Sequence, residues 1–154
     1  MTNSKFQIKT QAGQSLFEVV FAIGMSALII TAVVILGANA VANSTFSKNK
    51  ALAGRFTQET VEWLRSQRDA DWEAFAGYTG IQKRCLPELD WDSAIPNGCG
   101  ESDIIVTNAN FKRELTLTQI DSANIQVKVR VYWTDGRGIH ENSTVTNFTD
   151  WRRQ

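Results

Sequence analysis

The chain has 154 residues, of which 43% are hydrophobic and 21% are charged, so it is long enough to form one modest domain with a core. Its 16 basic and 16 acidic residues give a formal net charge of zero. This balance gives no electrostatic reason to expect a protein that binds nucleic acid or an anionic surface. The hydrophobic residues, however, are unevenly distributed along the chain.

The first 13 residues are polar and basic, and a long apolar segment follows them. Lys5 and Lys9 precede this segment without an acid, residues 19–36 contain no charge, and small or apolar residues continue to Ala42. As a helix, the segment is long enough to cross a hydrocarbon core of about 30 Å. The positive-inside rule then keeps the N-terminus in the cytoplasm and places everything after Ala42 outside.

Residues 15–70 contain no proline, which permits one continuous helix. Its first half is apolar on all sides, whereas its second half is amphipathic and is expected to lie on the core of a globular head. The residues expected to face this core are Phe46, Ala53, Phe56, Thr60, Trp63 and Leu64. Those expected to face elsewhere are Lys50, Arg55, Gln58, Glu62 and Arg65.

Residues 71–102 contain both prolines and both cysteines, and they are predicted to form an irregular loop region. Cys85 and Cys99 fall in the part assigned to the outside, where disulfides form and persist, so they are predicted to form one disulfide. A zinc site needs four ligands, and the single histidine lies far along the chain. The nearby acids Glu88, Asp90, Asp92, Glu101 and Asp103 lack the ordered ligand spacing of a calcium loop, so no metal and no cofactor are expected.

The last third of the chain predicts an antiparallel sheet. Residues 125–133 alternate between apolar and polar positions, which indicates a strand buried on one face through Ile125, Val127, Val129, Val131 and Trp133. Residues 111–119 predict a second strand, with Phe111, Leu115 and Leu117 inward, and residues 103–107 a third. Asp135 and Gly136 favour a tight hairpin turn, after which residues beyond Ile139 return as a further strand. The predicted fold is therefore α+β, a long N-terminal helix packed on a small antiparallel sheet.

Other residues offer little chemistry. His140, the one histidine, has no nucleophile and orienting group in its pattern and is expected to be exposed, so no catalytic residue is predicted. The basic pairs Lys83–Arg84, Lys112–Arg113 and Arg152–Arg153 could contact DNA phosphates but are expected to be solvated surface, because acids are interspersed with them. Trp63 and Trp133 are expected in the core, and the places of Trp72, Trp91 and Trp151 stay open.

Glu18 stands at the front of the apolar segment, where an ionised acid costs several kcal/mol unless it is paired. One ordinary explanation is that Glu18 lies at the membrane interface and is solvated. Another is a secretory signal cut after Ala40 or Ala42, which would release a secreted domain. The length of the apolar segment and the acid at its front both argue against such a signal.

The sequence "KTQAG" followed by "QSLFEVVFAIGMSALIITAVVILG" resembles the cleavage and methylation region of type IV pilins and their pseudopilin relatives. The resemblance implies that a prepilin peptidase cuts after Gly13 and methylates the new amino group of Gln14. It also implies that Glu18, fifth in the mature chain, interacts with the N-terminal charge of a neighbouring subunit during assembly. The chain departs from the family pattern in having Phe17 before the acid and Ile35 where many major pilins have a proline.

The function that this resemblance implies is that of a non-enzymatic structural subunit, a minor pilin or pseudopilin, in a pilus or a type II secretion-like pseudopilus. Residues 1–13 would be the leader, 14–42 the membrane and assembly half of the helix, and 43–154 the extracytoplasmic head. The expected partners are the peptidase, other pilin subunits, an inner-membrane assembly platform and the lipid bilayer; DNA is not indicated. The expected location is the bacterial cytoplasmic membrane and then the filament. The main alternative is an uncleaved, membrane-anchored extracytoplasmic binding module.

Overall fold

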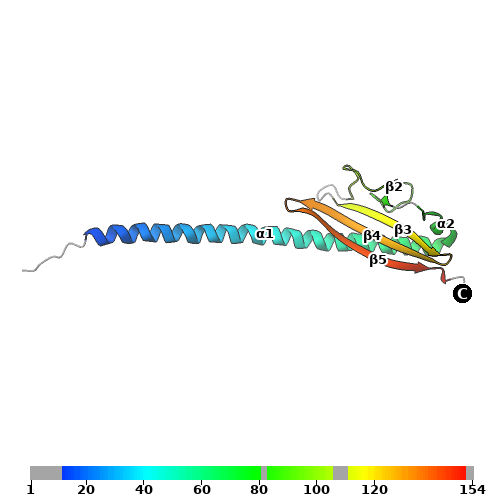
Figure 1. Cartoon of the computed structure of the whole chain (residues 1–154), viewed down its shortest axis with the longest axis horizontal. Coiled ribbons are helices and arrows are strands. Elements are labelled where there is room, and N and C mark those ends of the chain that lie inside the picture. The colour runs from blue at the N-terminus through cyan, green and yellow to red at the C-terminus, as the bar shows by residue number, and fades with distance from the viewer. Residues whose placement is uncertain (1–11, 81–82, 106–110, 152–154) are drawn as a thin grey trace, which may run out of the picture. The chain divides into compact units, whose positions relative to one another are not determined.

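The structure, a computed structural model, describes residues 12–80, 83–105 and 111–151, with side chains in the first helix from Leu16 onward. The chain divides into two compact units, Met1–Thr45 and Phe46–Gln154. Helix α1 (Ala12–Ala70) begins in the first unit and ends in the second. The second unit also contains the short helix α2 (Trp72–Gly77) and all the strands described (Figure 1).

The part of α1 in the second unit is amphipathic, as predicted. Ala53, Thr60 and Leu64 are buried, and the aromatic residues expected inward are half-buried against the core. The sequence pattern missed the burial of Thr57, whose hydroxyl donates to Ala53 O at 2.8 Å. This hydrogen bond satisfies the polar group within the helix, so a threonine can occupy a core position.

A five-stranded antiparallel sheet packs on this part of α1. Its spatial order is β2-β1-β3-β4-β5, and β3, β4 and β5 run side by side in Figure 1. The strands are β1 (Arg84–Cys85), β2 (Ile95–Pro96), β3 (Lys112–Asp121), β4 (Asn124–Asp135) and β5 (Gly138–Thr149).

The alternation predicted for β4 is confirmed, because its five apolar positions from Ile125 to Trp133 are all buried. Phe111, Leu115 and Leu117 are buried beside them, as expected. The hairpin is also confirmed: Asp135 pairs with Gly138, so the turn itself is Gly136 and Arg137. Gly138 has a φ of +119°, a conformation that side chains with a Cβ rarely adopt.

Two predictions about irregular segments were wrong. Residues 103–105 are not a strand, and the rest of that predicted strand, 106–107, lies outside the described residues. A turn occupies the position instead: Gly100 N donates to the Asp103 carboxylate at 2.6 Å, and Ile104 N donates to Ser102 O at 3.0 Å. Residues 71–102, predicted to be irregular throughout, contain α2, β1 and β2. Asp71 begins α2 because its side chain accepts the Ala74 N–H at 3.0 Å.

Arg113 is buried in the core side of the sheet, which contradicts its predicted place on a solvated surface. Its Nε donates to Leu86 O at 2.9 Å, its Nη1 to Thr60 Oγ1 at 3.2 Å and its Nη2 to Pro87 O at 3.4 Å. Burial lowers the pKa of the guanidinium to about 10, although Glu59 opposes this shift. The three bonds make the burial tolerable and join α1, β3 and the segment after β1.

We expect Arg113→Ala to lower the free energy of unfolding by about 2–4 kcal/mol, because the substitution leaves buried carbonyl acceptors unsatisfied and opens a cavity. The measurement is urea denaturation of the full chain in detergent, followed by tryptophan fluorescence. All five tryptophans lie at residue 63 or later, so the signal reports the second unit alone. The control is Arg55→Ala, at an exposed position of α1. Equal unfolding midpoints for the two variants would show that the Arg113 contacts contribute nothing.

Candidate functional site

The first unit presents an exposed apolar helix surface. Leu16 and Phe17 are each 74% exposed, and large apolar side chains remain exposed as far as Val41. Within the described residues, α1 is the one helix long and apolar enough to cross a membrane, and it contains an 18-residue window with a mean hydropathy of 2.8. This segment could therefore anchor the chain in a membrane.

The two hydroxyl side chains within this apolar surface, those of Ser26 and Thr31, are bonded to the helix itself. Ser26 Oγ donates to Ala22 O at 2.7 Å, and Thr31 Oγ1 donates to Ala27 O at 2.8 Å. Because each hydroxyl proton already has a carbonyl acceptor within the helix, these positions can be surrounded by lipid or by other apolar helices. A Cβ added at Gly24 would meet no atom within 4 Å, so this position leaves room for another surface to approach closely.

Glu18 lies on this helix between the exposed side chains of Phe17 and Val19. It is itself exposed, and no charged residue follows it in the sequence until Lys48. Among the described side chains, none forms an ion pair or hydrogen bond with it. Gly13 and Gln14, the predicted processing residues, lie in the first turn of the same helix. The carboxylate and the processing residues are thus brought close together at one helix end.

The predicted disulfide is present in the second unit. It joins Cys85, buried in β1, to Cys99, with the two Cα atoms 4.7 Å apart. It closes a loop that contains β2 and most of the acidic residues noted in the sequence. Glu88, Asp90, Asp92 and Glu101 are exposed, and Asp103 accepts from Gly100 N. Within the described residues, no three potential ligands gather into a metal-binding group.

The basic pairs are only partly the solvated surface that was expected, because Lys83 is exposed whereas Arg113 is buried. Besides the buried Arg113, Lys112 Nζ donates to Gly100 O at 2.6 Å, and Arg84 is half-buried with its Nη2 bonded to Tyr78 O at 3.0 Å. The pair Arg152–Arg153 lies outside the described residues. Apart from the exposed Lys83, the described residues of these pairs are committed to intramolecular contacts, so the pairs give no support to a DNA-binding surface.

The tryptophans left open by the sequence have separate places. Trp72 is buried, and Trp151 is 57% exposed. Trp91 stacks on Tyr78 with ring centroids 3.8 Å apart, contacts Trp63 at 4.8 Å, and donates from Nε1 to Gln67 Oε1 at 3.1 Å. Trp63, expected in the core, is half-buried beside it. These contacts anchor the loop that carries Trp91 to the end of α1.

His140 is half-buried, whereas the sequence predicted an exposed side chain. Its ring lies 5.1 Å from Phe46 and 5.4 Å from Trp133, and its Nε2 is 2.9 Å from Asp135 Oδ1. The same carboxylate oxygen accepts the Arg137 N–H at 2.8 Å. The hydrogen bond from the Arg137 backbone N–H lowers the pKa of Asp135 most, and the bond with His140 lowers it further. The arrangement closes the hairpin and offers no nucleophile.

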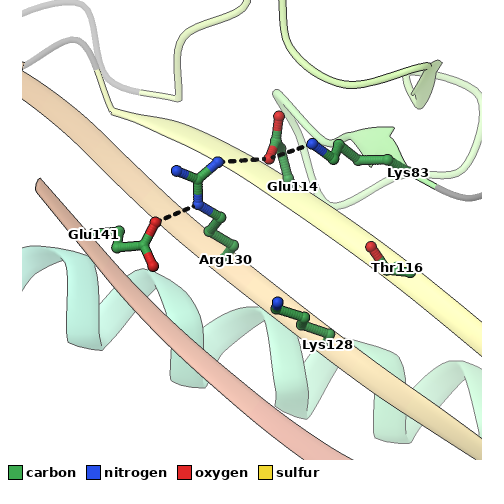
Figure 2. Close-up of a pocket in the computed structure, with 6 residues that line it drawn as sticks. All are labelled: Lys83, Glu114, Thr116, Lys128, Arg130 and Glu141. Atoms are coloured by element: carbon green, nitrogen blue, oxygen red, sulfur yellow. Dashed lines mark hydrogen bonds and ion pairs between the residues drawn. The ribbon is translucent and has the colours of Figure 1, made fainter. Parts of the chain in front are cut away.

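The face of the sheet opposite α1 carries a hollow of about 280 Å³, which we call the charged groove. Figure 2 shows its residues, and a chain of ion pairs crosses it. Glu114 Oε2 lies 3.6 Å from Lys83 Nζ and 3.1 Å from Arg130 Nη1, and Arg130 Nε lies 2.6 Å from Glu141 Oε2. The groove is lined by Lys83, Glu114, Thr116, Lys128, Arg130 and Glu141.

Electrostatics within the charged groove hold Arg130 as a cation. Partial burial alone would lower its pKa, but the hydrogen bonds that Arg130 donates to Glu141 and Glu114 outweigh burial and raise it. Tyr132, on the same face, has its pKa raised by desolvation and by the nearby charge of Glu114. The sequence missed this groove because its residues come from β3, β4, β5 and the residue before β1, and only strand register brings them together.

Comparisons with protein-family models, curated proteins and solved structures find no match for this chain.

We expect acid to weaken the hairpin through Asp135. Because its folded pKa lies below the ordinary value, the folded state binds fewer protons than the unfolded state in that range, so its stabilising contribution is lost as the pH falls below about 4. Asp135→Asn keeps a good turn residue but does not titrate, so its urea midpoint should fall less between pH 6 and pH 3 than that of the original chain. Asp92→Asn, at an exposed site, is the control. An unchanged acid sensitivity in Asp135→Asn would contradict this role.

Proposed function

We propose that the chain is a structural subunit, a minor pilin or pseudopilin, of a type IV pilus-like filament or a type II secretion-like pseudopilus. The observation that carries the proposal is Glu18, an exposed carboxylate without a described partner, at the front of an uncovered apolar helix. A monomer gains nothing from a charge at this position. A subunit that packs against other subunits gains an ion pair if the neighbouring subunit supplies a cation.

The physical argument starts from the cost of an unpaired charge. An ionised acid within or at the edge of a bilayer is unfavourable unless a cation lies close by. Cleavage after Gly13 by a prepilin peptidase would create such a cation at the amino group of Gln14, and methylation would leave it charged. Pairing of Glu18 with the amino group of a neighbouring subunit would then stabilise an assembled bundle relative to separate subunits.

The surface of the helix suits assembly as well as membrane insertion. Its hydroxyls are bonded within the helix, and the open space at Gly24 allows another helix to pack closely there. Hydrophobic association is weak between helices in lipid, so transfer into a filament would require an inner-membrane assembly platform. The subunit would first reside in the cytoplasmic membrane, with residues 43–154 outside, and then in the filament.

A second candidate, an uncleaved membrane-anchored binding module, is favoured by the charged groove alone. Such a module would keep Met1 and use the second unit to bind a ligand. It gives Glu18 no role beyond solvation at the membrane interface, which is why we prefer the filament subunit.

We expect the full chain, expressed with a prepilin peptidase, to begin at methylated Gln14. Intact mass and N-terminal sequencing measure this directly, and a Gly13→Val variant should stay uncut because the peptidase site is altered. A chain that begins at Val41 or Asn43 would identify a secreted domain instead. An uncut Met1 in the unaltered chain would favour the anchored module.

We expect Glu18→Ala to reduce incorporation into filaments about tenfold or more, because loss of the subunit-to-subunit ion pair removes more than about 1.4 kcal/mol per contact. The urea midpoint of the second unit should be unchanged, since Glu18 lies in the first unit. Thr31→Ala is the matched control: it removes a polar group from the same helix that is already bonded internally. Normal incorporation of Glu18→Ala would refute the pairing argument.

A further inference from the structure

The charged groove holds a row of groups suited to a carboxylate. Thr116 on β3 pairs with Lys128 on β4, and Lys83 immediately precedes Arg84, which pairs with Leu115. A threonine hydroxyl is therefore flanked on each side by a lysine, and all three line the same hollow (Figure 2). Two ammonium groups and a hydroxyl are donors that an anionic oxygen accepts from.

The charges within the groove do not cancel. Its lining contains three cations and two carboxylates, and both carboxylates engage Arg130. Among the described residues, Lys83 forms a single ion pair, a 3.6 Å contact to Glu114, and its side chain is 49% exposed. Lys128 is exposed and forms no hydrogen bond or ion pair within the described residues, and no dashed line reaches it in Figure 2. The uncompensated positive charge therefore lies at the Lys83–Lys128 row.

The complementary charge is present on the same chain, in the segment between β1 and β2. Glu88, Asp90 and Asp92 are exposed, and none of the three forms an ion pair within the described residues. We call these three residues the acidic segment. Trp91, between two of them, is anchored by Tyr78, Trp63 and Gln67. This anchoring orders the backbone before binding, which reduces the entropy lost on association.

We propose that the charged groove of one copy binds the acidic segment of a second copy. The two surfaces are different parts of the chain, so the contact is heterologous and can repeat along an open assembly rather than close as a two-fold dimer. Exposed ion pairs contribute little energy each, so the contact fixes the register of neighbouring heads while other surfaces supply most of the affinity. The inference rests on the proposed filament for its setting, but it is tested separately.

The test is zero-length carbodiimide cross-linking of the full chain, which condenses a lysine amine with a carboxylate. A mixture of unlabelled and ¹⁵N-labelled chain is cross-linked both in detergent and in filaments. We expect mass spectrometry to find peptides of mixed isotope that join Lys83 or Lys128 to the acidic segment. Cross-links within single copies only, or mixed cross-links only to Lys48, Lys50 or Lys112, would overturn the proposal.

Charge reversal supplies the second measurement. Lys128→Glu and Asp90→Lys should each reduce the mixed-isotope yield between the remaining groups about fivefold, consistent with the loss of one or two surface pairs. Mixing the two variants should restore it, because the reversed charge in the groove of one copy would then face the reversed charge in the acidic segment of the other. Lys48→Glu, an exposed lysine outside the groove, is the matched control. An equal loss with Lys48→Glu, or no recovery on mixing, would contradict specific docking.

The outcomes separate this inference from the proposed function. Mixed cross-links in detergent without any filament would support docking while the filament proposal fails. Filaments that form without these cross-links would overturn docking alone. A DNA oligonucleotide could instead protect Lys83 and Lys128 against chemical acetylation. This protection, together with absence of the cross-links, would assign the groove to nucleic acid and overturn the proposal.

Discussion

The packing of one face of α1 against one face of the sheet is the contact on which the rest of the second unit depends. Ala53 and Leu64 on the helix meet the buried positions of β4, and the aromatic rings of Phe111 and Trp133 fill the space between the layers. Because this contact buries one face of the sheet, the strand residues that alternate with the core, among them Thr116, Lys128 and Arg130, lie on the other face. The apolar layer therefore determines where the charged groove lies.

Sequence periodicity predicted the longer elements, in which buried residues recur once per turn of a helix or at every second position of a strand. The amphipathic half of α1, the alternation in β4 and the tight turn to β5 all follow from local pattern, because burial on one face imposes a fixed period. Short elements are different. The two-residue strands β1 and β2 have no period to detect, and they exist because they pair with β3 and with each other.

Arg113 and the charged groove show why the remainder could not be predicted. A charged side chain at an inward position is tolerated only if acceptors from elsewhere meet it, and Thr60, Leu86 and Pro87 are distant in sequence. The groove likewise depends on the register that sets Lys83 beside Thr116. Glu18 was identifiable without any tertiary contact, because its significance lies in its own position: one acid before a long uncharged run.

The disulfide has a consequence for when and where the second unit becomes competent to associate. Cys85 and Cys99 enclose the acidic segment, and Cys99 N donates to the Glu114 carboxylate at 3.4 Å, so the bond borders both of the surfaces that we assign to docking. In the reducing cytoplasm such a bond does not persist, and this loop would be unconstrained there. On the proposed topology, the second unit would form this bond only after export, so oxidation would restrict docking between neighbouring copies to the extracytoplasmic side.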